Sequence, residues 1–149
     1  MSANSGATWP DTPATSLVHD DVEEAVFDAV IEISESITGL DVLSWPDDSR
    51  GAFVVIDDVV LSNSWATERT WLGLRITCAY PEADAYPLYV RADLQRRDGS
   101  PLTSPFNVGH QFADRSAVML SRSNPRKAKA ASSAAVRIIN TIEFLGTAS

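Results

Sequence analysis

The most constraining feature of this sequence is an alternating apolar stretch, Trp71–Leu94, that two Tyr-Pro pairs interrupt near its middle. Apolar side chains occupy every second position on both sides of the interruption: Leu72, Leu74, Ile76, Cys78 and Tyr80 before it, and Leu88, Val90, Ala92 and Leu94 after it. Because strand side chains alternate between the two faces of a sheet, this pattern predicts two strands, the first with one apolar and one mixed face. The connection is too short for a helical crossover, so the two strands are expected to pair antiparallel.

An amphipathic helix is predicted before this hairpin, with Asp20 or Asp21 as its N-cap and Gly39 just past its end. Its apolar stripe recurs at spacings of three and four residues and comprises Val22, Val26, Ala29, Val30, Ile33 and Ile37. An acidic row lies off that stripe and comprises Asp28, Glu32 and Glu35. The helix is therefore expected to pack its apolar stripe on a sheet.

Short runs of apolar residues predict further strands between this helix and the hairpin. Val42-Leu43 is expected to begin a short strand. Two β-branched runs, Ala52–Ile56 and Val59–Leu61, form either one strand with a bulge or two strands. The polar stretch Ser62–Glu68 follows them and is predicted to be a loop that carries Trp65.

The sequence after the hairpin predicts a loop, a strand and a second helix. Pro101–Gln111 contains two prolines and a glycine and shows no periodicity, so it is predicted to be a loop, whereas Ala117–Leu120 predicts a short strand. The helix is expected to start with Asn124 as N-cap and Pro125 at its first position, and to close at Gly146. Its apolar stripe comprises Ala131, Ala134, Ala135, Ile138, Ile142 and Leu145.

These elements indicate one domain. Residues 1–17 are small and polar and contain two prolines, so they are predicted to be a flexible leader whose Trp9 docks either on the domain or on a partner. No internal repeat or linker divides residues 18–149. The order of helix, mostly antiparallel strand meander and helix predicts an α+β domain.

Composition narrows the class of protein. A net charge of −8 argues against binding to nucleic acid, which requires phosphate neutralisation, and against attachment to anionic membranes. No apolar run approaches the 18 residues of a membrane span, and the N-terminus lacks the basic and apolar regions of a secretory signal. The single cysteine excludes an internal disulfide. A cytoplasmic location is expected.

The charge is unevenly distributed along the chain. Residues 1–60 hold 13 acids and one base, Arg50, whereas residues 61–149 hold 7 acids and 11 bases. Five of those bases lie before or in the first turn of the predicted second helix: Arg115, Arg122, Arg126, Lys127 and Lys129. A helix dipole disfavours cations at this end by roughly 0.3–1 kcal/mol each. The cluster therefore predicts a partner-binding surface or, alternatively, an internal contact with the acidic half.

No residue pattern predicts a catalytic, cofactor or metal site. Cys78 falls on the apolar parity of its strand and is expected to be a buried, inert thiol. His19 adjoins acids at a helix start, and His110 lies four residues before Asp114 without a recognisable nucleophile motif. Glycine-rich phosphate-binding motifs are absent from the sequence. The chain is therefore expected not to be an enzyme.

The Tyr80-Pro81 to Tyr86-Pro87 segment, placed after a helix and a strand meander, resembles the ubiquitin-conjugating enzyme superfold. The resemblance covers about residues 20–145 and implies an N-terminal helix, a four-stranded antiparallel meander and a C-terminal helix. It also implies structural roles for the two Tyr-Pro pairs, and Cys78, whose structural role follows from the strand pattern, precedes them and cannot be the catalytic cysteine. Family members place their catalytic cysteine after the meander, but the corresponding segment, Phe106–Asn124, contains none.

Two functions follow as hypotheses. The resemblance implies a non-catalytic scaffold in a bacterial ubiquitin-like pathway that binds a ubiquitin-like modifier or an activating-enzyme-like protein. The acidic composition instead suits an immunity protein or a secretion chaperone that binds a toxin or effector through acidic residues, namely Asp28, Glu32, Glu35, Asp47 and Asp48. An enzyme with an unrecognised site is a third possibility.

Overall fold

The computed structural model describes residues 17–82, 87–121 and 133–147, which form a six-stranded antiparallel sheet and two α-helices. The helices are α1 (Glu24–Ser36) and α2 (Ala134–Thr147), and the strands are β1 (Val42–Pro46), β2 (Ala52–Val60), β3 (Arg69–Ile76), β4 (Leu88–Arg91), β5 (Phe106–Phe112) and β6 (Arg115–Leu120). The strands lie side by side in the order β1-β2-β3-β4-β6-β5. The α+β class is confirmed, but a sheet of only four strands is wrong.

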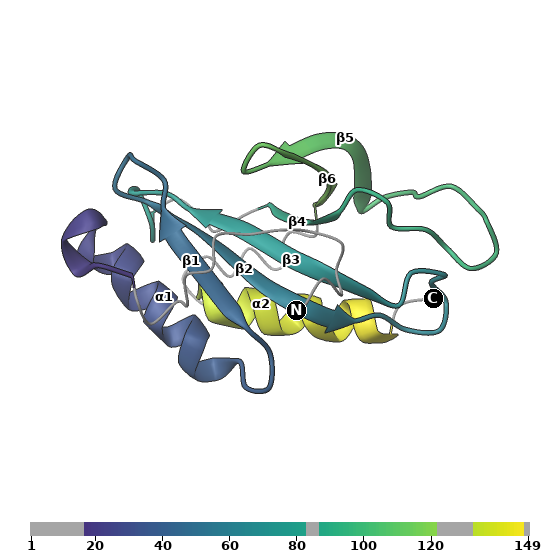
Figure 1. Cartoon of the computed structure of the whole chain (residues 1–149), viewed down its shortest axis with the longest axis horizontal. Helices are drawn as coiled ribbons and strands as arrows, with labels where there is room; N and C mark the ends of the chain where they lie inside the picture. Colours follow the sequence, from purple (N-terminus) through teal and green to yellow (C-terminus); the bar gives the residue numbers. More distant parts are fainter. Residues whose placement is uncertain (1–16, 83–86, 122–132, 148–149) are drawn as a thin grey trace.

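The two helices cover one face of the sheet, and the β5–β6 hairpin bends away on the other side (Figure 1). The predicted stripe of α1 is buried in the core between the helices and the sheet: Val22, Val26, Ala29, Val30, Ile33 and Ile37. From α2, the core receives Ala134, Ala135, Ile138 and Leu145. Leu17 is also buried there, at the end of the predicted leader, whereas residues 1–16 with Trp9 lie outside the described ranges.

The first helix begins later than predicted. Residues His19–Asp21 form a 3-10 turn, and the α-helix starts at Glu24 with Glu23 at its cap position. The carbonyl oxygens of Asp20 and Val22 accept hydrogen bonds from the Arg50 guanidinium, at 2.8 and 2.9 Å. Because they bond to a distant side chain instead of to helical N–H groups, the α-helix does not extend back through these residues.

The β-branched runs form one bulged strand, which decides between the two alternatives that the sequence left open. Ile56 lies opposite Leu72 and Val59 opposite Thr70, so the register shifts between the runs. Asp58 has a φ of 67°, a left-handed conformation that aspartate tolerates better than β-branched residues do. The bulge lets β2 continue along β3 after the interruption.

The predicted pairing at the centre of the sheet is confirmed, but its first strand is shorter than the alternation indicated. Leu72 and Leu74 lie opposite Val90 and Leu88. The strand ends at Ile76, and the Tyr80 N–H donates to the Thr77 carbonyl oxygen at 2.9 Å across a turn. Cys78 lies in that turn and is exposed, so the expectation of a buried thiol is wrong.

Tyr80, the first residue of the Tyr-Pro segment, links this turn to the start of α2 through a hydrogen bond. The Ala134 N–H at the start of α2 donates to the Tyr80 hydroxyl oxygen at 3.1 Å, and the Tyr80 ring packs partly buried against the core. Pro81 follows in the turn and is exposed, and Pro87 immediately precedes β4. Tyr86 lies outside the described residues.

The exposed position of Cys78 leads to a simple expected result. A thiol reagent should label Cys78 about as fast in the native protein as in denaturant, because Cys78 is exposed. Cys78→Ser should change the free energy of unfolding by less than about 0.5 kcal/mol. Labelling kinetics with and without urea check the expectation, and labelling that requires urea would contradict it.

The predicted loop Pro101–Gln111 overlaps strand β5, so that prediction is wrong over residues 106–111. The five residues from Asn107 to Gln111 are exposed, and β5 lies at the edge of the sheet. A strand with little buried surface needs no alternation of apolar and polar residues, which is why its sequence resembled a loop.

Helix α2 begins at Ala134, and the Ser133 hydroxyl oxygen accepts the Val136 N–H at 3.2 Å as an N-cap does. The predicted helix start at Asn124 and Pro125 lies outside the described ranges, as do four of the predicted partner-binding cations, namely Arg122, Arg126, Lys127 and Lys129. Within the described ranges, no helix is long and apolar enough to cross a membrane.

Candidate functional site

The sheet face opposite the helices carries a second apolar cluster. Five aromatic side chains from different strands gather there, and we call this surface the aromatic face: Trp45, Phe53, Trp71, Tyr89 and Phe112. Trp71 and Phe112 are buried, whereas Trp45, Phe53 and Tyr89 remain half-buried. No helix of the described residues covers this face (Figure 1). The sheet therefore presents partly exposed aromatic rings to its surroundings.

Strand register brings these residues together. Trp45 lies opposite Phe53, and Gly73 lies opposite Tyr89, each on the parity that points away from the helices. Sequence reasoning missed this site because its members come from five strands and meet only once the register is known. One signal was present in β1 to β4, each of which carries an aromatic residue on the parity opposite its buried core positions. In β5 that signal is absent, because Phe112 shares the parity of the core residue Phe106 and the register shifts between them.

Phe112 is at the centre of the aromatic face. Its ring centroid lies 5.2 Å from that of Tyr89, 5.5 Å from that of Phe53 and 5.8 Å from that of Trp71. The ring rests on Gly73, where an added Cβ would lie only 2.7 Å from Phe112 Cε2. A residue with a side chain at position 73 would therefore collide with Phe112, which explains the glycine in the middle of β3.

Arg75 and Asp47 border the aromatic face next to Phe53. The Arg75 guanidinium carbon lies 5.6 Å from the Phe53 ring centroid, and Arg75 Nε donates to Asp47 Oδ2 at 2.8 Å. Asp47 Oδ1 also accepts the backbone N–H groups of Ser49 and Gly51, both at 2.8 Å. Burial raises the pKa of the Asp47 carboxyl, but these hydrogen bonds outweigh burial and hold the pKa below its usual value.

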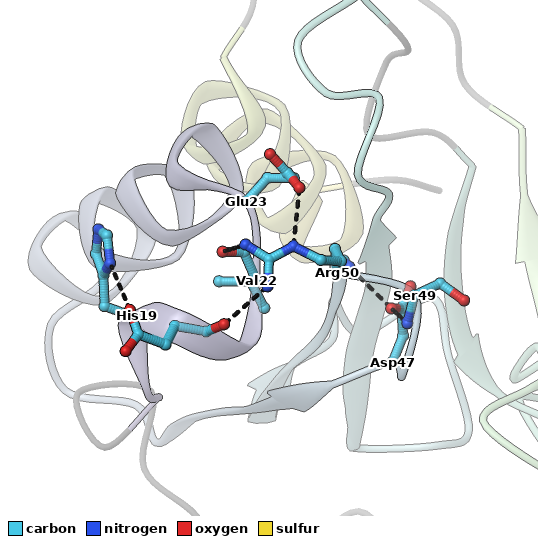
Figure 2. Close-up of polar contacts among 8 residues, drawn as sticks. His19, Val22, Glu23, Asp47, Ser49 and Arg50 are labelled. Atoms are coloured by element: carbon cyan, nitrogen blue, oxygen red, sulfur yellow. Dashed lines mark hydrogen bonds and ion pairs between the residues drawn. The ribbon is translucent and has the colours of Figure 1, made fainter.

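Arg50 connects the β1–β2 turn to the start of α1 (Figure 2). Its Nε donates to Glu23 Oε2 at 2.8 Å, and its backbone carbonyl oxygen accepts the Glu23 N–H at 2.9 Å. Arg50, the only base in the first 60 residues, thus has an internal role. The Asp47 loop in Figure 2 lies beside it, so the same turn fixes both the helix and the border of the aromatic face.

The acidic residues that the immunity-protein or chaperone hypothesis assigns to partner binding differ in their exposure. Asp28, Glu32 and Glu35 are exposed on α1, and none of them forms an ion pair with another described residue. Asp48 is exposed too, but the Asp47 side chain is only 1% exposed and is bonded to Arg75. Asp47 is therefore not available to a partner in this structure, whereas Asp48 and the acidic row of α1 remain exposed.

Part of the charge asymmetry is neutralised between strands. Asp47 pairs with Arg75, and Asp58 lies 3.8 Å from Arg69, so acids of the first half meet bases of the second. Arg115, the one predicted partner-binding cation within the described ranges, is half-buried at the start of β6 and lies opposite Phe112. It therefore borders the aromatic face.

The candidate catalytic residues are not brought together. His110 lies on β5 opposite Ala117, whereas Asp114 lies in the tight turn that follows, and no hydrogen bond joins them. The His19 ring packs edge-on against Phe27 with centroids 4.7 Å apart. The described residues contain no group of three or more histidine, cysteine or acidic side chains that could hold a metal ion.

An open polar hollow of about 490 Å³ lies between the end of β4 and the start of β3. Arg91 and Asp93 line it and hydrogen-bond to each other, which holds the pKa of the Asp93 carboxyl below its usual value. The remaining guanidinium nitrogen of Arg91 donates to the Arg69 carbonyl oxygen at 3.0 Å. Three of the five N–H groups of Arg91 thus have internal partners, and we assign no ligand to this hollow.

Comparisons with known proteins add no functional assignment. Neither the family models nor the curated proteins nor the solved structures contain a match to this chain. The aromatic face is therefore assessed on its own geometry.

Proposed function

We propose that this protein is a non-catalytic protein-binding module and that it contacts its partner through the aromatic face. The observation that carries the proposal is the half-burial of Trp45, Phe53 and Tyr89 on a sheet face that no described helix covers. Tryptophan, tyrosine and arginine are the residues enriched in binding hot spots, and Arg75 borders this surface. Contiguous apolar patches rimmed by polar groups are typical of interaction sites.

We further propose that it acts as an inactive ubiquitin-conjugating-enzyme-like scaffold in a ubiquitin-like pathway. The consecutive antiparallel order of β1, β2, β3 and β4 after α1, with Tyr80-Pro81 following the third strand, supports this resemblance. The β5–β6 hairpin departs from it, because it occupies the segment in which active members carry their cysteine. The partner would be a ubiquitin-like modifier or an activating-enzyme-like protein.

Replacing Trp45 by alanine is expected to weaken binding of the partner by about 30-fold or more, the effect of a hot-spot tryptophan. Affinity capture from the native cell with the wild-type chain identifies the partner, and titration calorimetry compares the two chains. Val136→Ala is the matched control, because Val136 is 41% exposed on α2, away from the aromatic face. Equal affinities for wild type and Trp45→Ala would contradict the proposal.

A second candidate function, a chaperone or immunity protein that binds a basic toxin or effector, is favoured by the exposed acidic row of α1. Asp28, Glu32 and Glu35 form no ion pair with the described residues, so a basic partner could neutralise them. Reversing all three to lysine would then slow association strongly and reduce its salt dependence. If binding survives that reversal but not Trp45→Ala, this second function is excluded.

A further inference from the structure

The Arg75 guanidinium is held on one side only. Its Nε donates to Asp47 Oδ2 at 2.8 Å, and the Arg75 side chain is 47% exposed. Within the described ranges, its terminal nitrogens Nη1 and Nη2 have no hydrogen-bond partner. Arg50 in the neighbouring β1–β2 turn differs, because its Nε, Nη1 and Nη2 all bond to the segment before α1 (Figure 2). Arg50 is thus committed to the fold, whereas the donors of Nη1 and Nη2 of Arg75 remain available.

Asp47 fixes the position of this guanidinium. The Asp47 side chain is 1% exposed, and its Oδ1 accepts the backbone N–H groups of Ser49 and Gly51. The turn is so tight that an added Cβ at Gly51 would lie only 2.6 Å from Asp47 Oδ2. The carboxylate is therefore locked in place, and it holds the Nε side of Arg75 before any partner arrives. A guanidinium that is already oriented loses less conformational entropy when it binds a ligand.

Strand register places this guanidinium beside exposed ring surface. Phe53 lies opposite Arg75 on β3 and opposite Trp45 on β1, so the three side chains form one row across the aromatic face. The Phe53 ring centroid lies 5.6 Å from the Arg75 guanidinium carbon and 5.6 Å from the Trp45 ring centroid. Trp45 and Phe53 are both half-buried. The row therefore combines oriented N–H donors with apolar surface.

We propose that the partner contributes a carboxylate to Nη1 and Nη2 of Arg75, next to an apolar side chain that packs on Trp45 and Phe53. This inference rests on the proposed function and specifies the chemistry of the partner. A guanidinium donates two parallel hydrogen bonds to a carboxylate, and these charge-assisted bonds are stronger than those to a neutral amide. Because the Asp47 carboxylate lies beside the guanidinium, a singly charged group is repelled less than a doubly charged phosphate.

Short peptides test the carboxylate on the wild-type chain without any partner. Acetyl-Glu-Trp-amide and acetyl-Gln-Trp-amide differ only in one charge, and NMR titration in the millimolar range follows the Nε–H signal of Arg75 and the indole N–H signal of Trp45. We expect the acidic peptide to bind at least about threefold more tightly. Equal affinities of the two peptides, or unchanged signals with both, would overturn the inference.

A third peptide identifies where the carboxylate comes from. Acetyl-Gln-Trp with a free C-terminus carries its carboxylate at the end of the chain instead of on a side chain. Tighter binding of this peptide than of acetyl-Glu-Trp-amide would assign the role to a chain terminus of the partner, and the reverse order would assign it to an acidic side chain. Either order supports a carboxylate at Arg75, provided that both peptides bind more tightly than acetyl-Gln-Trp-amide.

Arg75→Gln should abolish the preference for the acidic peptide, and Arg69→Gln is the matched control that should keep it. Arg69 starts the same strand, its side chain is 44% exposed, and it lies 3.8 Å from Asp58. Each comparison sets two peptides against one variant, so a change in stability affects both peptides alike and cancels. A preference that survives Arg75→Gln would overturn the inference.

Affinity for the captured partner separates this inference from the proposed function. Arg75→Gln should weaken partner binding by about tenfold or more and reduce its salt dependence, because a charged pair at the interface is lost. Arg69→Gln should change the affinity by less than about threefold, as expected for an exposed charge outside the interface. If Trp45→Ala weakens binding but Arg75→Gln does not, the proposed function stands and the carboxylate contact is wrong.

Discussion

Replacing Trp65 by alanine should lower the free energy of unfolding by about 3–5 kcal/mol, the usual cost of deleting a fully buried aromatic side chain. Trp65 is 1% exposed, and its ring packs edge-on against Phe106 with centroids 5.2 Å apart. The Arg96 guanidinium carbon lies 4.7 Å above it. The residue therefore anchors the loop before β3 to the segment that follows β4, and its loss leaves a cavity that the surrounding chain cannot fill.

Urea unfolding at pH 7, followed by circular dichroism, measures this effect. Trp45→Ala is the matched control, because the same side chain is removed from a half-buried position on the aromatic face. It should cost less than half as much stability as Trp65→Ala. The two variants therefore separate stability from the proposed binding: Trp65 supports the fold, whereas Trp45 lies on the aromatic face. Similar losses of stability for both variants would show that the aromatic face is packed as tightly as the core.

Asp47→Asn should lower the free energy of unfolding by about 1.5–3 kcal/mol, the range for hydrogen bonds to charged groups. The carboxylate accepts hydrogen bonds from Arg75 Nε and from the backbone N–H groups of Ser49 and Gly51. Asparagine has one acceptor oxygen, so it cannot satisfy all three donors. Asp48→Asn is the matched control, because Asp48 is exposed and asparagine tolerates its φ of 69°.

The pH dependence of this effect has a definite sign. Folding lowers the pKa of Asp47, so its contribution is fully present above the unfolded-state pKa of about 3.9 and is lost as the pH falls through the lower folded-state pKa. Wild type and Asp47→Asn should therefore converge in stability as the pH falls below about 4. Urea midpoints between pH 7 and pH 2 measure this, and a constant difference down to pH 2 would contradict the expectation.

Local sequence patterns predicted the elements whose apolar residues recur at helical spacing or alternate along a strand. The stripe of α1 follows from spacings of three and four residues, and the pairing of β3 with β4 follows from alternation and a short connection. Cys78 was misplaced because the alternation of residue types continues past Ile76, although the strand does not. Periodicity reports which face a residue would occupy, but a turn can end a strand without changing that pattern.

The aromatic face could not be predicted in the same way. Trp45 and Phe112 are far apart in the sequence, and they join one cluster only because both rings pack against Phe53 on β2. Phe112 in particular depends on β5, whose exposed residues look like a loop. Long-range register and an edge strand without periodicity are therefore the two pieces of information that local patterns do not contain.

Hydroxyl-radical footprinting of the free and partner-bound chain tests most directly whether the aromatic face is the binding surface. Trp45, Phe53 and Tyr89 are half-buried in the free chain, so all three residues remain partly accessible to the radical. On binding, we expect oxidation of these three rings to fall while the exposed residues of α1 keep their reactivity. Protection confined to α1, with unchanged oxidation of Trp45, Phe53 and Tyr89, would contradict the account.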